Sequence, residues 1–389
     1  MKIAYVIHRY GQEVRGGAEQ ACRLLAEHLT AATGWSVEVF TTCARDGTDW
    51  ADEYPPGDTV EGGVAVHRFL SVAGRDPGFE PFSARVLPQR GAAPVADQER
   101  WVDLQGPVCP DLLSAAAASD ADVLVFCPYL YWPTVRGVPR LRERAVMHPA
   151  AHDELPIRLP LFRSVFGAAR GFAYFTDAER RLVERMFPVA SRPQAVIGLG
   201  VDVGAGDPDT FRRTHGLADR PYLLCLGRVD DGKGASSLAA FFAAYKRRHP
   251  GPLALAFVGP VVHEQAPHPD IVVTGPVDEA LKWGALSGAR ALVSPSAFES
   301  FAIVLMEAWS AGTPVVVNAR CEVTREHCER SSGGLWFDGY ASFEAVLDRI
   351  LEDEHLARGL ARRGKEFVER HYRWPVVVER YRAFLASLV

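Results

Sequence analysis

The first forty residues decide the class of fold. Residues 3–40 read IAYVIHRYGQEVRGGAEQACRLLAEHLTAATGWSVEVF. The apolar run at residues 3–7 is typical of a buried strand, and apolar positions spaced three and four apart over residues 18–31 predict an amphipathic helix. Gly34 ends this helix, and the apolar run at residues 37–40 predicts another strand. A strand, a helix and a strand in this order form a βαβ unit, so we expect a parallel sheet.

The same alternation of strands and helices fills two blocks of the chain. Its 389 residues exceed what one hydrophobic core organises, which is about 250–300 residues. Residues 198–220, rich in glycine and acidic residues, break the apolar pattern, and we place the interdomain linker there. The expected domains are residues 1–197 and 198–375, both doubly wound α/β units. Ligands of such sheets bind beyond the carboxyl ends of the strands, so we expect the site in a cleft between the two domains.

The remaining elements follow from the same patterns. Residues 45–110 look irregular apart from one strand at residues 64–69, and so long an irregular stretch is usually functional. Pro375 interrupts the helical pattern, and residues 376–389 predict a last helix whose apolar stripe is too wide for a free tail. The other expected strands are 123–126, 145–147, 173–175, 195–197, 222–226, 254–258, 271–273, 291–295 and 314–317, and the other expected helices are about 159–170, 236–247, 278–286, 301–311 and 341–370.

Composition and charge exclude several classes of protein. The chain is 48% hydrophobic and 23% charged, which excludes disordered, collagen-like and coiled-coil chains. A net charge of −5 gives no strong basic field, so no nucleic-acid partner is expected. The 7 cysteines never show C-x-x-C spacing, which favours a reducing compartment and argues against a structural zinc. The polar N-terminus and the lack of a long apolar run predict a cytoplasmic location.

The strongest local motif is PSAFESFAIVLMEAWSAGTPVVV, residues 295–317. We expect Glu299 in a loop after a strand, Ser300 as the cap of a helix over residues 301–311, and Gly312 just past its end. The backbone N–H groups at such a helix start form an anion site, and here they belong to Phe301, Ala302 and Ile303.

Two acids of this motif are spaced for one extended ligand. Glu299 and Glu307 would stand about 12 Å apart along a helix axis, too far to share a proton. That separation suits two carboxylates that grip different parts of one molecule. An equally open interpretation makes Glu299 a capping acid and Glu307 part of a solvated helix face.

Two glycine-bearing loops could also face phosphate groups. In LGRVDDGKG, residues 226–234, Arg228 and Lys233 flank a turn between a strand and a helix, which suits a diphosphate. An ordinary strand-to-helix turn with surface charges remains open there. In the segment Arg15–Glu19, Gly16 and Gly17 allow close approach of a phosphate, although the spacing is not that of a G-x-G-x-x-G fingerprint.

Metal binding is not expected. His148 and His152 stand four residues apart after a strand, but Pro149 argues against a helix that would put both on one face. We expect His152 to be a polar group facing the cleft, with a packed core histidine as the alternative. Two D-x-D pairs, Asp120/Asp122 and Asp207/Asp209, read as turn and cap acids.

In this order the motifs resemble the family-4 retaining glycosyltransferases of the GT-B fold, over essentially the whole chain. The most specific part is E-x7-E from Glu299 to Glu307, followed by G-R-V-D…K-G at residues 227–234. Gly-Gly-Ala-Glu at residues 16–19, His152-Asp153-Glu154 and Gly200-Val201-Asp202 also match. The resemblance implies two Rossmann-like domains facing across a cleft, with residues 376–389 completing the first.

The resemblance also implies a role for each residue. Glu299 would hold hydroxyls of the donor sugar, Glu307 the ribose, and His152 would face the sugar ring near the reacting carbon. Arg228 and Lys233 would clamp the diphosphate. The groups that would cradle it are Gly16, Gly17, Gly227 and the backbone after Ser300, at Phe301, Ala302 and Ile303. Glycine usually occupies the position of Ala302 in this family, and we expect the alanine to cost little in a first helical turn.

The implied reaction is retaining transfer of a sugar from a UDP- or GDP-linked donor to a hydroxyl acceptor, without a metal or other cofactor. The two cations and the helix start would stabilise the leaving diphosphate. The acceptor surface is expected over residues 71–110 and 129–144, where arginines and aromatic residues permit a membrane lipid and peripheral membrane contact. A soluble small molecule or a growing polysaccharide is equally allowed as the acceptor. Two rivals are a catalytically silent protein that binds sugar nucleotides and an NAD-dependent oxidoreductase, which lacks its glycine fingerprint here.

Overall fold

The computed structural model describes residues 1–14 and 16–389. The chain forms two compact units, one of Met1–Gly200 with Trp374–Val389 and one of Val201–Arg373. The boundaries thus lie after residues 200 and 373, where the sequence predicts them after residues 197 and 375. Arg15, the first residue of the first glycine loop, lies outside the described residues.

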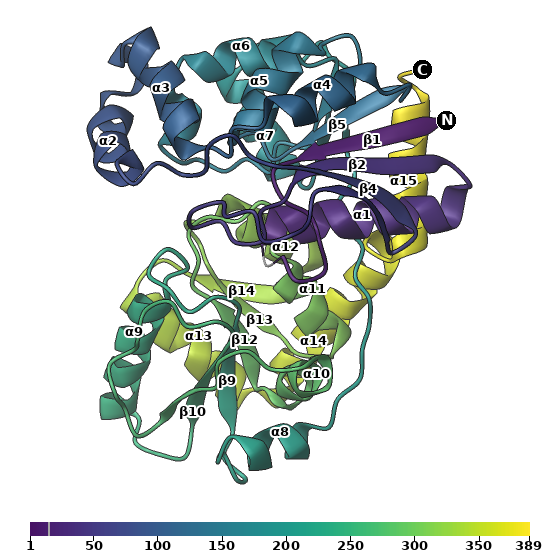
Figure 1. Ribbon diagram of the computed structural model, residues 1–389. Helices are drawn as coiled ribbons and strands as arrows, with labels where there is room; N and C mark the ends of the chain where they lie inside the picture. Colours follow the sequence, from purple (N-terminus) through teal and green to yellow (C-terminus); the bar gives the residue numbers. More distant parts are fainter. Residues whose placement is uncertain (15) are drawn as a thin grey trace. The chain divides into compact units, whose positions relative to one another are not determined.

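The first unit is built on one sheet of the order β3-β4-β2-β1-β5-β6-β7-β8 (Figure 1). Its strands pair in parallel except for β3, which runs antiparallel to β4. The strands are β1 Lys2–Ile7, β2 Ser36–Thr42, β3 Gly57–Glu61, β4 Val64–Phe69, β5 Val123–Cys127, β6 Ala145–Met147, β7 Gly171–Tyr174 and β8 Gln194–Val196. The parallel sheet expected from the first forty residues is therefore present, with β2 and β5 on either side of β1.

Helices cover this sheet, and five of them were not expected from the sequence: those over residues 79–86, 95–105, 110–118, 132–140 and 177–186. Residues 45–110 are not largely irregular, because they contain α2 and α3 as well as β3. Both helices are short, so their apolar period spans few turns, yet Phe79 and Trp101 are buried between them and the sheet. The helices are α1 Gly17–Thr33, α2 Phe79–Val86, α3 Val95–Gln105, α4 Pro110–Ala118, α5 Trp132–Arg140, α6 Leu161–Ala168, α7 Asp177–Met186 and α15 Trp374–Ala386.

The last helix, α15, packs in the first unit although it follows the whole second unit in sequence. In Figure 1 the yellow α15 lies beside the purple α1. Trp374 stacks on His28 of α1 with ring centroids 3.7 Å apart, and the hydroxyl of Tyr5 in β1 donates to that of Tyr381 at 3.2 Å. The apolar stripe of α15 is thereby buried.

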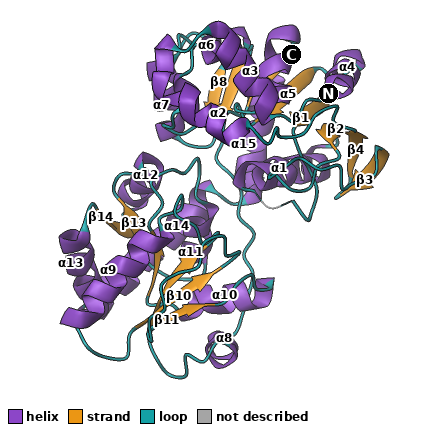
Figure 2. Cartoon of the chain, turned by 60° about the vertical axis from the view of Figure 1, so that its left-hand side comes forward, coloured by secondary structure: helices purple, strands orange, loops and turns teal. Residues whose placement is uncertain are grey.

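The second unit holds a parallel sheet of the order β11-β10-β9-β12-β13-β14 (Figure 2). Its strands are β9 Tyr222–Leu226, β10 Ala254–Val258, β11 Ile271–Val273, β12 Ala291–Ser294, β13 Val315–Asn318 and β14 Gly334–Phe337. Its helices are α8 Pro208–Thr214, α9 Ala235–Arg248, α10 Glu279–Gly288, α11 Ile303–Ser310, α12 Glu322–Ser331, α13 Tyr340–Glu352 and α14 Glu354–His371.

Three local features of this unit differ from the sequence analysis. The helical tract expected over residues 341–370 is two helices, because Asp353 leaves the helical conformation and caps α14 by accepting from the Leu356 N–H at 2.8 Å. α12 and β14 were not expected. The predicted linker, 198–220, contains α8, which Asp207 caps.

Candidate functional site

In the second unit, an aspartate shapes the turn that follows β9. The carboxylate of Asp230 is buried and accepts a hydrogen bond from the Lys233 backbone N–H at 2.7 Å. Its other oxygen accepts from the Nε of Arg228, whose side chain stays 59% exposed. Gly227 has φ 129° and Gly234 φ 79°, backbone conformations that favour glycine. The G-R-V-D…K-G pattern therefore encodes a rigid turn that presents Arg228 to solvent.

The turn also brings two predicted site residues together. Lys233 Nζ lies 2.7 Å from Oε1 of Glu299, and both side chains are partly exposed. Lys233 follows β9 and Glu299 follows β12, and these strands are neighbours in the sheet. Because the carboxyl ends of parallel strands share one edge, the pair lies where ligands of such sheets bind.

The helix after Glu299 starts later than the sequence suggests. α11 begins at Ile303, so Ser300 is not its N-cap, and Phe301 and Ala302 are outside the helix. Ala302 is the N-cap, with φ 63° and ψ 62°, and its carbonyl accepts from the Leu305 N–H at 3.0 Å. The expectation that alanine costs little here is wrong, because this left-handed conformation favours glycine. The expected helix end is confirmed: Gly312, with φ 82°, follows the C-cap of α11.

The second acid of the E-x7-E motif is buried against a lysine. Glu307 is 8% exposed, and Lys282 Nζ on α10 lies 2.9 Å from its Oε1 and 2.8 Å from Glu279. Burial raises the pKa of Glu307, and the charge of Lys282 opposes that shift. The solvated-face interpretation is therefore wrong. Because α11 begins at Ile303, Glu299 and Glu307 do not share a helix, and the 12 Å expectation no longer applies.

Lys282 was missed in the sequence because it is a lone lysine in an expected helix. No motif marks it, and only the fold brings α10 beside α11. Trp309, also on α11, is a packing residue: it is fully buried and donates from Nε1 to the Gly333 carbonyl at 2.9 Å.

In the first unit, the glycine loop after β1 leads into a buried ionic cluster. Glu19 lies 2.9 Å from His8 Nε2 and 2.6 Å from Arg9. Burial would raise the pKa of Glu19, but the hydrogen bond to His8 and the charge of Arg9 outweigh it and lower that pKa. A Cβ on Gly16 would lie 2.2 Å from the Glu19 carboxylate, so a larger residue at this position would have to displace that carboxylate. Gly17 is the first residue of α1.

His152 lies in the loop that follows β6. Its side chain is 33% exposed, and Nε2 is 3.4 Å from Oε2 of Glu154, whose other oxygen accepts from the Tyr129 hydroxyl at 2.7 Å. His148 is buried against Phe175, and burial lowers its pKa to about 3. The two histidines do not share a helix, as Pro149 indicates.

The acids of the D-x-D pairs have structural partners. Asp120 pairs with Lys2, and Asp122 accepts from the Lys2 backbone N–H at 2.7 Å. Asp207 caps α8, and Asp209 pairs with Arg212 at 2.9 Å. Within residues 1–14 and 16–389, no group of three His, Cys, Asp or Glu side chains is placed to hold a metal ion.

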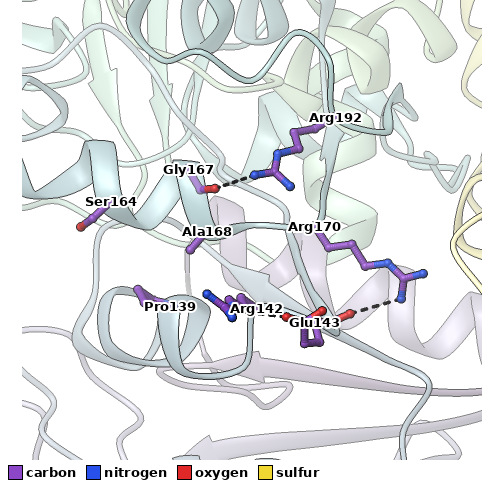
Figure 3. A pocket seen from close by; sticks show the side chains of 8 residues that line it. All are labelled: Pro139, Arg142, Glu143, Ser164, Gly167, Ala168, Arg170 and Arg192. Carbon is purple, nitrogen blue, oxygen red and sulfur yellow. Dashed lines mark hydrogen bonds and ion pairs between the residues drawn. The ribbon is translucent and has the colours of Figure 1, made fainter.

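The first unit also has a hollow of about 830 Å³ lined by three arginines, Arg142, Arg170 and Arg192 (Figure 3). It lies before the amino ends of β6, β7 and β8, the edge opposite to the strand ends described above. Arg192 donates to the Gly167 carbonyl at 3.0 Å near the end of α6, and Arg170 donates to the Glu143 carbonyl at 3.3 Å. These guanidinium groups satisfy backbone carbonyls, so we do not place the candidate site here.

Comparisons with known proteins agree with this arrangement. The model of a family described as glycosyl transferases group 1 matches residues 207–367. A GDP-mannose-dependent alpha-(1-6)-phosphatidylinositol monomannoside mannosyltransferase of Mycobacterium tuberculosis is 26% identical over 64% of this chain and 70% of its own. A D-inositol 3-phosphate glycosyltransferase of Frankia alni is 29% identical over 85% of each chain. The solved sucrose-phosphate synthase of Thermosynechococcus elongatus superposes over 100% of both chains, with a TM-score of 0.72 at 19% identity.

The fold and these relatives define the chain as a glycosyltransferase with the GT-B fold. It is an enzyme that transfers a sugar from a nucleotide sugar to an acceptor, and its second unit carries the match to the group 1 glycosyl transferases. The fold and enzyme class predicted from the sequence are therefore confirmed. None of the helices within residues 1–14 and 16–389 combines the length and apolar content needed to cross a bilayer.

Proposed function

We propose that the chain is a retaining hexosyltransferase that works without a metal ion. The observation that carries the proposal is the Lys233–Glu299 pair, 2.7 Å apart beside the exposed Arg228 at the carboxyl ends of β9 and β12. A nucleoside diphosphate needs fixed positive partners, and a sugar needs hydrogen-bond acceptors for its hydroxyls. One short stretch of the sheet edge offers both.

Each residue receives a role in this proposal. Arg228 and Lys233 bind the diphosphate, and Glu299 accepts hydrogen bonds from sugar hydroxyls while holding the Lys233 ammonium. Glu307 accepts from the ribose hydroxyls. The start of α11 adds the backbone N–H groups of Ile303 and Val304, which point out of the helix start and donate to the diphosphate in this proposal. His152 and the Gly16–Gly17 loop serve the donor from the first unit.

The reaction that fits these groups breaks the bond between the anomeric carbon and the diphosphate oxygen. The electron pair leaves with the diphosphate, whose growing charge the two cations stabilise. The acceptor hydroxyl attacks from the same face, and its proton passes to the leaving phosphate oxygen. This sequence conserves the anomeric configuration and needs no carboxylate nucleophile.

Metal independence rests on the charges already present. Two cationic side chains take the place that a divalent ion holds in other transferases. The acids of both D-x-D pairs are engaged as caps or ion-pair partners, which supports the same conclusion.

The acceptor is a hydroxyl-bearing molecule, for which the relatives suggest one class. The names of the mycobacterial and Frankia relatives both mention a substrate that contains inositol. We therefore place soluble inositol phosphates and phosphatidylinositol lipids first among the acceptors to be tried, with growing glycans as the alternative.

Ligand binding and slow donor hydrolysis test the proposal. Thermal unfolding is followed with UDP, GDP and NAD in parallel, and a true ligand at 100-fold its Kd adds about 2.7 kcal/mol of stability. Stabilisation by UDP or GDP but not NAD supports the donor site. Hydrolysis of a panel of UDP- and GDP-sugars then identifies the donor, and nuclear magnetic resonance of the product reports its anomeric configuration. Binding of a nucleotide without hydrolysis or transfer of any donor would favour the catalytically silent alternative, and an inverted product would refute retention.

A further inference from the structure

A buried glutamate in the first turn of α7 bridges two strand ends of the first unit. Glu179 is 1% exposed. One carboxylate oxygen accepts from the Phe175 backbone N–H at 2.7 Å, just after β7, and the other accepts from the Ala151 N–H at 2.8 Å, in the loop after β6. The backbone N–H of Thr176 also favours the charged form of this carboxylate. No motif in the sequence analysis included Glu179, although T-x-x-E at residues 176–179 is a capping-box pattern.

The bridged loop is held in an unusual conformation. His148 N–H donates to the Phe126 carbonyl at 2.9 Å, and the Pro149 carbonyl accepts from the Tyr129 N–H at 2.9 Å, so the start of the loop is fixed to β5 and its extension. Ala150 then adopts φ 51°, a left-handed conformation that is strained for an alanine. A strained residue persists only where its surroundings hold it. The residue that follows the strained Ala150 in the chain is Ala151, whose N–H donates to Glu179.

Helix capping alone does not explain Glu179. The cap of α7 is made by Thr176, whose side chain accepts from the Glu179 backbone N–H at 3.1 Å. A helix-capping acid does not need to contact another loop. Burying a carboxylate costs desolvation free energy, and the bond to the Ala151 N–H compensates part of that cost. The carboxylate instead joins the α7 start to the residue immediately before His152.

We propose that Glu179 is a positioning residue for His152, which it holds through the Ala151 backbone N–H. The inference rests on the proposed function, in which His152 serves the donor sugar. Loss of the bridge frees the Ala150–Ala151 turn to relax, and a shift of about 1 Å at His152 is enough to slow a reaction about 100-fold.

The test compares two substitutions in the same helical turn. In Glu179→Gln the amide keeps one acceptor but turns an N–H group toward a backbone N–H, so one of the two bridges is lost. We expect kcat to fall at least about tenfold with a smaller change in the KM for the donor, because the proposed diphosphate and ribose contacts lie in the second unit and only His152 is displaced. Thr176→Ala is the matched control: it weakens the same cap and leaves the Ala151 bridge, and its kcat should stay within about twofold of wild type. Glu179→Asp keeps the charge on a shorter side chain, and its kcat should lie between those of the other two variants. It replaces Glu179→Gln in the test if that variant does not fold.

Hydrogen–deuterium exchange supplies a readout that is independent of catalysis. The Ala151 amide, followed in overlapping peptides within residues 149–153, should exchange slowly in the wild type and in Thr176→Ala, and at least about tenfold faster in Glu179→Gln. Slow exchange in Glu179→Gln would overturn the bridge, and fast exchange with unchanged kcat would overturn the positioning role. An equal loss of kcat in Glu179→Gln and Thr176→Ala would reduce Glu179 to a stability residue. If no nucleotide sugar is turned over by the wild type, the proposed function fails, while the exchange result still decides whether the bridge holds this loop.

Discussion

The left-handed alanine before α11 allows a test that isolates one backbone conformation. Ala302 has φ 63° and is 8% exposed, while Ala308 lies fully buried in the body of the same helix. We compare Ala302→Gly with Ala308→Gly. Both changes remove a buried methyl group, and both raise the conformational entropy of the unfolded chain by the same amount. They differ in the backbone conformation that the new glycine must adopt.

The lost methyl group and the unfolded-state entropy are common to both variants, so they cancel when the two free energies of unfolding are compared. At Ala308, glycine costs about 1 kcal/mol relative to alanine in addition to the lost methyl contact, and most of this cost is the unfolded-state entropy that Ala302→Gly raises equally. At Ala302, glycine relieves the about 1–2 kcal/mol that a left-handed conformation costs an alanine. Ala302→Gly should therefore be more stable than Ala308→Gly by about 1–2 kcal/mol in the free energy of unfolding. For a unit of this size that corresponds to roughly 2–8 °C in Tm.

Urea titration of each variant, followed by circular dichroism and by tryptophan fluorescence, measures the two free energies of unfolding. Equal destabilisation by both substitutions would refute the claim that Ala302 is strained. The donor KM, measured on the same samples, shows whether removal of the methyl group also widens the space before the helix. If it does, Ala302→Gly should have a lower donor KM than the wild type.

Three further outcomes can be measured on the same protein. Lys233→Ala and Arg228→Ala should each reduce kcat/KM about 10–150-fold with little change in Tm, since each charge-assisted contact is worth about 1.5–3 kcal/mol and both side chains are partly exposed; near-wild-type turnover would remove them from the diphosphate site. Turnover should persist in EDTA, and a loss that Mg²⁺ or Mn²⁺ restores would contradict the metal-free proposal. Burial raises the pKa of Glu179 from 4.5 to about 7, so the folded state binds the proton more tightly than the unfolded state, and stability should fall as the pH rises from 4.5 to 7, by at most about 3 kcal/mol. The charge of His152 opposes the rise in the pKa of Glu179 and therefore reduces the dependence of stability on pH. Glu179→Gln should remove this dependence, and an unchanged dependence in that variant would show that other groups cause it.

The sequence predicted the parts of the fold that depend on periodicity and on signals at element ends. The βαβ start, the positions of most strands and the end of α11 before Gly312 follow from apolar spacing and from glycine at a helix end. Five short helices of the first unit, α2, α3, α4, α5 and α7, were missed because two or three turns give too little period to recognise. The start of α11 was misplaced because Ser300 is a good cap by residue type, while the backbone turns at Ala302, where no residue preference announces a left-handed alanine.

For the candidate site, sequence motifs found the residues but not their partners. The glycine turn and the E-x7-E element located Arg228, Lys233 and Glu299 correctly at the carboxyl ends of neighbouring strands. The contacts of Lys282 with Glu307 and of Glu179 with Ala151 join segments far apart in sequence, so a single sequence carries no trace of them. The roles of the site residues, the cytoplasmic location and the acceptor surface stay predictions.

The return of α15 to the first unit has a consequence for how the chain folds during synthesis. The second unit is one continuous segment, Val201–Arg373, whereas the first needs Trp374–Val389 to cover α1 and β1. Residues 374–389 are synthesised after the whole second unit, so the first unit can be completed only after the second has been made. Until then the Trp374 site on His28 and the Tyr381 site beside Tyr5 expose apolar surface on the nascent chain. A truncation before residue 374 would therefore destabilise the first unit and leave the second unit folded.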